Sequence, residues 1–478
     1  MSSREERLEQ LRAERFAQSR KPISGAAAAQ EYLRLLWDPV GRMRELQRRH
    51  GNIIALGPVA FGAPGKTHVL AIGPDYNRLA LSDPANFRPT GLLLRGPKNS
   101  AQRRVRYGLT RMTGAEHKQQ RAMVAPPFHR GAVMGYHEIM VRVVGATIAQ
   151  WQPGTRVDIY QEIRKLTLRI ASSILFSNDS DEAYPIGRML EHWMVQSFAP
   201  SVLAFPLDLP GTAYHGMLRN AEEIERHILA MIARRRAAPD ARADVLSLLM
   251  ETRDADGVGM TDAELVGQIA ILFVASFETT TSALTWTLFL LAQHPEIANA
   301  LLDEIQSALS DAPPSADALM HLELLGHVVK ESMRILPPVP YTVRATQDEF
   351  FFGPYYVLHG ARIVLSHYLT HHLPDLYPEP EKFRPARWQT INPNQYEYMP
   401  FSAGPRVCIG AAFATQVLKI SIAMILQRFR FTVVPGTRID RVVRITMNPR
   451  GGLPMQLEKQ DRKFSRSSVI GQIREMVQ

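Results

Sequence analysis

The single cysteine of the chain, Cys408, lies in a segment that suits a metal-bound thiolate. A free thiol has a pKa of about 8.5, so a thiolate at neutral pH needs positive potential and hydrogen-bond donors near the sulfur. Gly404 permits a tight turn with positive φ, and Gly410 removes a Cβ where a flat ligand must approach the backbone. The run Ala411–Lys419 predicts a helix whose amino end points N–H groups back at the sulfur. Arg406 can reach an anionic group of the ligand, so the segment suits an iron porphyrin.

A lone cysteine is more often an inert buried residue than a ligand. Here five positions match the pattern Phe-x-x-Gly-x-Arg-x-Cys-x-Gly: Phe401, Gly404, Arg406, Cys408 and Gly410. With this pattern the chain resembles the cytochrome P-450 family, the haem-thiolate monooxygenases. The resemblance implies that Cys408 is the axial ligand of haem b, and that the haem lies between a long central helix and the loop that carries Cys408.

A second match lies in Glu331-Ser-Met-Arg334, which is followed downstream by Phe383-Arg-Pro-Ala-Arg387-Trp388. An i,i+3 pair on a helix surface stabilises it by only a few tenths of a kcal/mol. The resemblance instead implies a buried triad of Glu331, Arg334 and Arg387. We expect this triad to support the fold rather than to take part in chemistry.

The expected catalytic residues lie on a long helix in the middle of the chain. Thr261 and Glu264 form a predicted capping box, and the helix is expected to run to about Gln293. The polar stretch Glu278–Ser282 interrupts its apolar run, which favours a buried core helix over a membrane span. Activating dioxygen in a dry site needs protons, which a carboxylate such as Glu278 and a hydroxyl such as Thr279 can deliver.

Thr279 can also donate a hydrogen bond to the carbonyl of Ala275, four residues earlier, and so open the helix. The alternative is a mid-helix threonine that bonds back without purpose, a common arrangement. Glu278 is harder to explain in that way, because burying a carboxylate is costly. Family members carry glycine where this chain has Ser276, so we expect a narrower oxygen groove or an added hydrogen bond.

Three further residues match the positions of haem-propionate ligands in the family. His117 and Arg121 are spaced i,i+4 and therefore share a helix face, and Arg344 follows the break at Pro337-Pro338. Two desolvated carboxylates favour such donors. Taken singly, each residue would more often be an ordinary solvated charge.

Composition and length agree with one large helical enzyme. The resemblance implies a mainly α-helical chain with a small β region, the α+β cytochrome P-450 fold. The hydrophobic fraction of 45% in 478 residues is enough for a large core, and no linker divides the sequence. We expect an N-terminal extension at 1–23, a single catalytic domain at 24–457 and a C-terminal tail of unknown role at 458–478. Asp38 and Pro39 predict a helix start, Gly51 its end, and 53–56 with 68–72 a hairpin.

The net charge of +10 would suit a nucleic-acid-binding protein, but the arginines are scattered and no nucleic-acid motif is present. A basic face for an acidic electron donor explains the charge better, with Lys118 and Arg130 as expected contacts. The chain contains no flavin or ferredoxin module. The resemblance therefore implies an acidic ferredoxin or flavodoxin partner with its NAD(P)H reductase. The charged amino terminus has no apolar segment of anchor length, which indicates a cytoplasmic enzyme without a membrane anchor.

The sequence thus favours a monooxygenase that inserts one atom of dioxygen into a small apolar organic substrate by hydroxylation or epoxidation. Two alternatives remain: an enzyme that uses peroxide or rearranges an oxygenated substrate, and a haem-binding sensor that needs neither Glu278 nor Thr279. In the family the substrate pocket is built from segments matching 90–111, 195–215 and 339–342. The expected apolar lining residues, which could also be ordinary core, are Leu92, Leu93, Phe198, Phe205, Phe277 and Val339.

Overall fold

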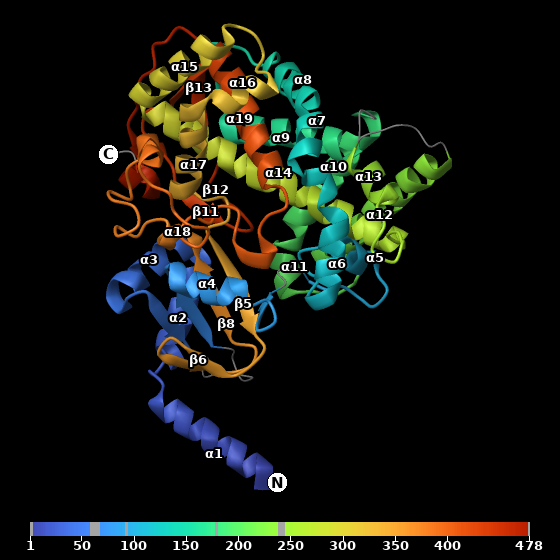
Figure 1. Ribbon diagram of the computed structural model, residues 1–478, viewed down its shortest axis with the longest axis vertical. Helices are drawn as coiled ribbons and strands as arrows, with labels where there is room; N and C mark the ends of the chain where they lie inside the picture. Colours follow the sequence, from blue (N-terminus) through green and yellow to red (C-terminus); the bar gives the residue numbers. More distant parts are fainter. Residues whose placement is uncertain (1–2, 58–66, 91–93, 177–179, 238–243, 477–478) are drawn as a thin grey trace. The chain divides into compact units, whose positions relative to one another are not determined.

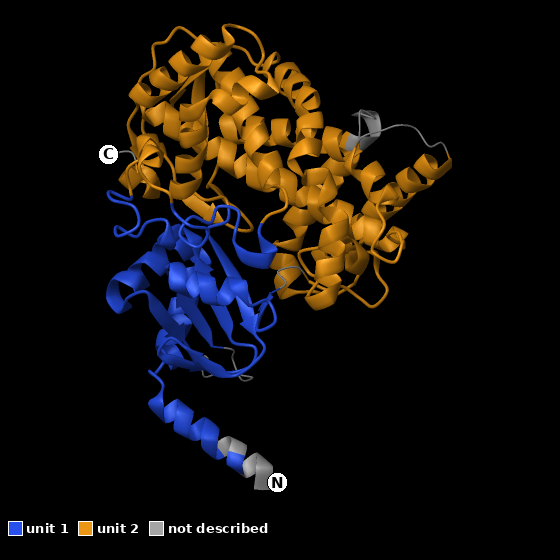
Figure 2. Ribbon diagram, in the orientation of Figure 1, with its two compact units in different colours: residues 1–90, 339–380, 393–407 blue, residues 91–338, 381–392, 408–478 orange. Residues whose placement is uncertain are grey.

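The computed structural model describes residues 3–57, 67–90, 94–176, 180–237 and 244–476. Its backbone forms two compact units, which Figure 2 shows in blue and orange. Unit 1 contains residues 1–90, 339–380 and 393–407. Unit 2 contains residues 91–338, 381–392 and 408–478.

Unit 1 is organised around a five-stranded sheet with strand order β1-β2-β8-β5-β3. Strands β1 and β2 form the predicted antiparallel hairpin, in which Ile53 lies opposite Ala71. Strand β2 then pairs in parallel with β8, from much later in the chain, and β5 pairs antiparallel with both β8 and β3. The strands span Ile53–Leu56 (β1), His68–Ala71 (β2), Phe87–Pro89 (β3), Tyr341–Thr346 (β5) and Arg362–Ser366 (β8).

Helix α3 of unit 1 begins and ends where the sequence places its start and stop signals. Helix α3 follows the N-cap Asp38, whose Oδ1 accepts a hydrogen bond from the N–H of Gly41 at 3.0 Å, and it ends before Gly51 at φ 87°. These are the boundaries that Asp38, Pro39 and Gly51 predict. The remaining elements of unit 1 are α1 (Ser3–Gln18), α2 (Gly25–Trp37), α3 (Pro39–His50), α4 (Pro74–Ser82), β6 (Phe350–Phe352), β7 (Tyr355–Val357), α18 (His367–Thr370) and η3 (Gly404–Arg406).

Unit 2 is mostly helical, with the long helix α14 (Asp262–Gln293) among the others in Figure 1. Helix α14 packs against α5, α9, α10, α17 and α19. The other helices of unit 2 are α5 (Ala101–Val105), α6 (Gly114–Val124), α7 (Arg130–Gly135), α8 (His137–Ile148), α9 (Ile159–Phe176), α10 (Ser180–Ser197), α11 (Pro200–Ala204), α12 (Ala213–Ala237), α13 (Val245–Glu251), α15 (Pro295–Leu309), α16 (Ala316–His321), α17 (Glu323–Ile335) and α19 (Ala411–Arg428), with short 3₁₀ turns η1 (Pro126–Phe128), η2 (Pro385–Gln389) and η4 (Gln472–Met476).

Helix α14 begins with the capping box that the sequence predicts. Thr261 Oγ1 accepts a hydrogen bond from the N–H of Glu264 at 3.3 Å, and Glu264 Oε2 accepts one from the N–H of Thr261 at 2.8 Å. The helix is long and apolar enough to span a membrane by length and composition alone. However, 78% of its most apolar window is buried within the protein, as in the core helix of a globular fold.

Small sheets complete unit 2. Strand β13 (Pro454–Lys459) lies between β4 (Thr155–Asp158) and β9 (Phe429–Val433), and β11 (Arg441–Val443) forms a hairpin with β12 (Met447–Pro449). In the C-terminal tail, β14 (Val469–Ile470) pairs in parallel with β10 (Thr437–Arg438), and Ile473 and Met476 are buried. The predicted mainly α fold with a small β region is confirmed, and the predicted boundaries at 23 and 457 stay predictions.

Candidate active site

One face of α14 is open, although the rest of the helix after its first turn is buried. Ile271, Ala275, Ser276 and Thr279 keep accessible surface, whereas all other residues from Leu265 to Gln293 are buried. Residues four apart lie on the same helix face, so Ile271, Ala275 and Thr279 form a continuous line. We call these four residues the open strip. Its two central side chains, Ala275 and Ser276, are small, which leaves room beside the helix backbone.

Thr279 Oγ1 donates a hydrogen bond to the carbonyl oxygen of Ala275 at 2.8 Å. This bond does not single out Thr279, because Thr280 and Thr281 each donate a similar bond to the carbonyl four residues earlier, both at 2.7 Å. What separates Thr279 from its neighbours is its surroundings, since Thr280 and Thr281 are buried. Of these three threonine hydroxyls, only that of Thr279 lies on the open strip.

Ser276, which stands where the family pattern has glycine, donates its hydroxyl to the carbonyl of Phe273 at 2.8 Å. The hydroxyl is therefore held against its own helix by an i,i−3 bond. The side chain adds volume to the open strip, and its hydrogen-bond donor is already used within α14.

Glu278 is buried, one residue before Thr279 but off the open strip. Its Oε2 accepts a hydrogen bond from Thr446 Oγ1 at 3.4 Å. Burial raises the pKa of Glu278, and the nearby Glu191 raises it further, while Arg164 lowers it. The carboxyl group is thus biased toward keeping its proton in the folded protein.

Cys408 is an exposed residue of unit 2, although protein atoms surround its sulfur closely enough to desolvate it. Burial raises the pKa of the thiol, whereas a hydrogen bond from the N–H of Gly410 and the positive charge of Arg121 lower it. The donors that the sequence predicts are therefore present, and burial outweighs them in the metal-free thiol. A metal would remove this proton outright on binding the sulfur.

Gly404 and Gly410, the two glycines near Cys408, differ in whether the fold leaves space for a side chain. Gly404 adopts φ 70°, and a Cβ there would lie 2.3 Å from the carbonyl oxygen of Leu81, so packing within unit 1 excludes a side chain. A Cβ on Gly410 would meet only the sulfur of Cys408, at 3.8 Å. The fold itself therefore leaves space at Gly410. Phe401 is half-buried in unit 1, and α19 begins directly after Gly410 as predicted.

His117 and Arg121 lie on α6, one turn apart. His117 is buried and Arg121 is half-buried. Burial lowers the pKa of Arg121, while Cys408 raises it, which places this guanidinium within electrostatic range of the sulfur. The structure thus brings Arg121 and Cys408 together within unit 2.

Arg344 and Arg406 influence each other within unit 1. Arg344 is 8% exposed on strand β5, and burial together with the charge of Arg406 lowers its pKa to about 10. Two partly desolvated guanidinium groups repel each other, so this arrangement favours an anionic ligand beside them.

Glu331, Arg334 and Arg387 form one buried ion network in unit 2. Both oxygens of Glu331 accept hydrogen bonds from Arg334, at 2.9 Å each, and Oε1 accepts another from Nε of Arg387 at 2.8 Å. Glu331 also accepts hydrogen bonds from Nε1 of Trp388 at 2.9 Å and from the N–H of Arg384 at 3.0 Å. The sequence did not predict the last two donors, although the adjacency of Trp388 to Arg387 is a signal for the first.

The residues expected to line the substrate pocket differ in how exposed they are. Leu92 and Leu93 lie outside the described residues. Phe198 and Val339 are half-buried, and Phe205, after α11, is 69% exposed. Phe277 is fully buried, with its ring centroid 5.4 Å from that of Phe273, and lies two positions from Ala275 and Thr279, hence across the helix from them. Phe277 therefore belongs to the core of unit 2, and its role in a substrate pocket stays a prediction.

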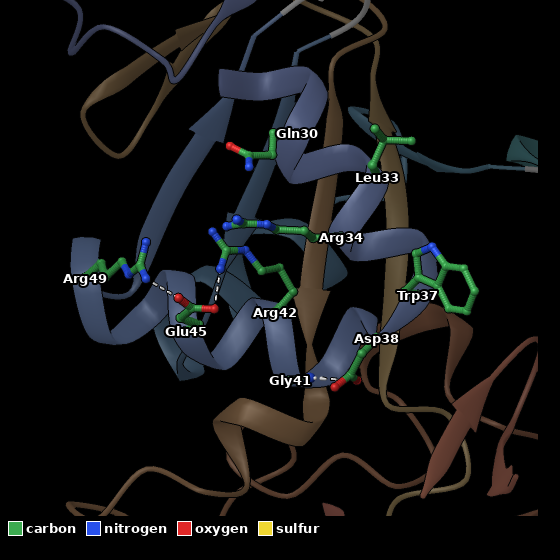
Figure 3. Close-up of a pocket in the computed structure, with 9 residues that line it drawn as sticks. All are labelled: Gln30, Leu33, Arg34, Trp37, Asp38, Gly41, Arg42, Glu45 and Arg49. Carbon is green, nitrogen blue, oxygen red and sulfur yellow. Dashed lines mark hydrogen bonds and ion pairs between the residues drawn. The ribbon is translucent and has the colours of Figure 1, made fainter. Parts of the chain in front are cut away.

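A separate pocket of about 800 Å³ lies on α2 and α3 of unit 1 and contains none of the expected site residues. Figure 3 shows Glu45 between Arg42 and Arg49, joined to both by ion pairs. Arg42 also binds Glu31. Because these charges compensate one another, the pocket offers little to a charged substrate.

The local arrangements fit a haem. Unit 2 offers an accessible sulfur, a glycine with open space above it and the positive charge of Arg121, and unit 1 offers a desolvated pair of arginines. Sulfur is a ligand for haem iron, and arginines suit propionates. These features belong to residues whose types and spacing match the haem-thiolate pattern.

Comparison with known proteins gives the same answer. The family model described as Cytochrome P450 matches residues 21–453. Cyclooctat-9-en-7-ol 5-monooxygenase from Streptomyces melanosporofaciens is 30% identical over 82% of this chain and 84% of its own length. Pentalenene oxygenase from Streptomyces avermitilis is 27% identical over 83% of this chain and 88% of its own.

Among solved structures, a retinoic-acid-bound cyanobacterial cytochrome P450 superposes with a TM-score of 0.78 and 26% identity, covering 90% of this chain and 96% of that one. A second cytochrome P450 haem domain, 23% identical, shares the fold with a TM-score of 0.80 over 93% and 99% of the two chains. The chain therefore belongs to the cytochrome P450 family.

Proposed function

We propose that this chain inserts one oxygen atom from dioxygen into an apolar organic substrate, by hydroxylation or epoxidation, with electrons from a separate protein. The family binds haem, and two relatives are named as a monooxygenase and an oxygenase, so the chain is an oxidoreductase of this kind. The observation that carries the proposal is the open strip of α14. There the accessible hydroxyl of Thr279 is next in sequence to Glu278, whose raised pKa favours the protonated carboxyl group.

Haem b, bound through Cys408, would supply the activation of dioxygen. Thr279 would then position a proton donor on the open strip, because its hydroxyl is accessible while its own hydrogen points to Ala275. Glu278 would hold a proton nearby, since burial favours its neutral form. Burial of Glu278 would limit the access of bulk water to its carboxyl group.

The charged residues around the expected haem would bind its two carboxylates. Arg121 on α6 is within electrostatic range of Cys408, and Arg344 with Arg406 forms a desolvated pair of cations. We assign these three residues, with His117, to the propionates. The Glu331 network would hold the chain near Cys408 in place without touching the haem.

Electrons would come from an acidic ferredoxin or flavodoxin with its NAD(P)H reductase. Lys118 lies on α6 between His117 and Arg121 and is exposed, as is Arg130 at the start of α7. A docking surface near these two cations would place the donor close to the sulfur side of the site. The net charge of +10 favours association with an acidic partner.

The substrate would be a hydrocarbon-rich molecule of terpenoid or retinoid character. Two relatives are named for cyclooctat-9-en-7-ol and pentalenene, and a structural relative was solved with retinoic acid. The small side chains of Ala275 and Ser276 leave space for a bulky skeleton beside α14. We also propose a cytoplasmic location, since α14, the helix of membrane-spanning length among the described residues, is a core helix.

The first experiment tests the ligand. Reduced, haem-loaded protein treated with carbon monoxide should show the red-shifted absorption band of thiolate ligation, and Cys408→Ala should abolish it. An unchanged band in the variant would refute the assignment.

Product formation with dioxygen, reductase and ferredoxin, compared with hydrogen peroxide alone, then separates a monooxygenase from a peroxide-dependent enzyme.

A further inference from the structure

Arginines are concentrated in the segment that connects to α6 in unit 2. Between residues 95 and 111 the sequence contains Arg95, Arg103, Arg104, Arg106 and Arg111, and no acidic residue. Helix α5 lies inside this segment and packs against α14. The segment therefore brings several positive charges to the helix that carries the open strip.

Two of these arginines have a clear structural partner. Arg104 forms an ion pair with Glu225 on α12, with Nη2 2.8 Å from Oε2. Arg103 donates from Nε to the carbonyl oxygen of Pro97 at 3.0 Å. These contacts anchor the segment and account for Arg103 and Arg104 as structural residues.

Arg106 and Arg111 lie close enough for their positive charges to repel each other. Arg106 is 5% exposed, and burial together with the charges of Arg111, Arg95 and Arg103 lowers its pKa to about 10. Burial and Arg95 likewise lower the pKa of Arg111, and its Nη1 is buried with no hydrogen-bond partner in the described part of the chain. Cations that repel each other and are wholly or partly removed from water are costly, and an anion beside them would offset that cost.

The backbone that carries these arginines crosses α14 in direct contact. The N–H of Leu109 donates to Gln268 Oε1 at 3.0 Å. A Cβ on Gly267 would lie 2.0 Å from the carbonyl oxygen of Tyr107, and one on Gly108 would lie 2.3 Å from Cγ2 of Ile271. Both glycines are thus required by close packing, which fixes the segment at one level of the helix.

The arginine segment contacts α14 where the open strip begins. Ile271 is the first residue of the strip, and Thr279 follows eight residues later on the same face. At 1.5 Å per residue the two positions are about 12 Å apart along the axis. A molecule that reached from the arginine segment to Thr279 would need a skeleton of about that length.

We propose that Arg106 and Arg111 bind an anionic group of the substrate, a carboxylate on an apolar skeleton, and that oxidation takes place at the end remote from that group. This inference rests on the proposed monooxygenase function and names its substrate class. A guanidinium matches a carboxylate with two parallel hydrogen bonds, and the buried surroundings strengthen them. The rest of the substrate would lie along the open strip, with its far end near Thr279.

Binding of paired ligands tests the proposal. Hexadecanoic acid, retinoic acid and abietic acid, each with its methyl ester, are titrated into haem-loaded protein by optical shift and by calorimetry. At least one acid should bind about tenfold or more tightly than its ester, the scale of one charge-assisted hydrogen bond. Arg111→Gln and Arg106→Gln should each bring this ratio close to one, and the hydroxylated carbon should lie at the end away from the carboxylate.

Lys98→Gln is the matched control, because it removes an exposed positive charge from the same segment and should leave the ratio unchanged. Equal binding of every acid and ester by the wild type would overturn the inference. So would Arg111→Gln protein that loses haem but keeps its preference for acids, since the arginines would then serve a haem propionate. Absence of the thiolate band with carbon monoxide would instead overturn the proposed function, and this inference with it.

Discussion

Thr279 and Thr280 make the same hydrogen bond to α14, 2.8 Å and 2.7 Å long, yet only Thr279 lies on the accessible face of the helix. The two residues have the same chemistry and differ by one position. They therefore provide a variant and its control for the catalytic role of the hydroxyl group.

We expect Thr279→Ala to retain haem and substrate binding while diverting electrons to hydrogen peroxide or water. Loss of a positioned proton donor should lower the product formed per NAD(P)H consumed by about tenfold or more. Thr280→Ala, in the buried position, should keep the wild-type ratio. The measurement is product against cofactor consumption, and equal ratios in all three proteins would remove Thr279 from the mechanism.

The pH dependence of stability should report on Glu278. Burial raises its pKa above the ordinary value of 4.5, so the folded protein keeps a proton that the unfolded chain releases. The free energy of unfolding should therefore fall as pH rises above about 4.5, until pH passes the folded-state pKa. Glu278→Gln lacks this titration. Denaturant unfolding at pH 5 and pH 8 should show the wild type losing stability relative to the variant, and parallel pH profiles would contradict the raised pKa.

The Glu331 network should dominate local stability. Glu331→Gln removes the charge that two buried guanidinium groups share, so the free energy of unfolding should fall by about 3–5 kcal/mol. Glu323→Gln changes an exposed carboxylate on the same helix and should have an effect within about 0.5 kcal/mol. Denaturant midpoints give both values. A small effect at Glu331 would mean that the arginines find other partners.

Electron transfer should depend on salt and on Lys118. Exposed charges are screened as the Debye length falls from about 10 Å at 0.1 M salt to about 3 Å at 1 M. Reduction rates with an acidic ferredoxin should therefore decrease with ionic strength, and Lys118→Glu should slow them without changing substrate binding. Lys165→Glu, an equal reversal on α9, is the control. Rates indifferent to salt and to Lys118 would require a different partner surface.

Local signals in the sequence were enough to predict several elements. Thr261 with Glu264, and Asp38 with Pro39, mark helix starts because capping involves residues only three apart. The hairpin of β1 and β2 is likewise a pairing of neighbours. The motif around Cys408 carried the family resemblance without any knowledge of the fold.

Contacts between distant segments could not be predicted in this way. Strand β2 pairs with β8 nearly 300 residues later, and Thr446 reaches Glu278 across 168 residues. No local pattern encodes such pairings, because tertiary packing decides them. The same holds for Phe277, whose apolar character fits both a pocket and a core, and for the close approach of Gly267 to Tyr107.

The open strip also separates two effects of substitution that usually occur together, the effect on the yield of folded protein and the effect on activity. Over most of α14 a substitution should reduce the yield of folded enzyme, because the side chains there are packed on all sides. At Ala275 and Thr279 larger or altered side chains should be tolerated by folding and yet abolish or redirect oxidation. A saturation library of this helix should therefore show expression and selectivity responding at different positions. These few residues would be the natural starting points for evolving the enzyme toward new products.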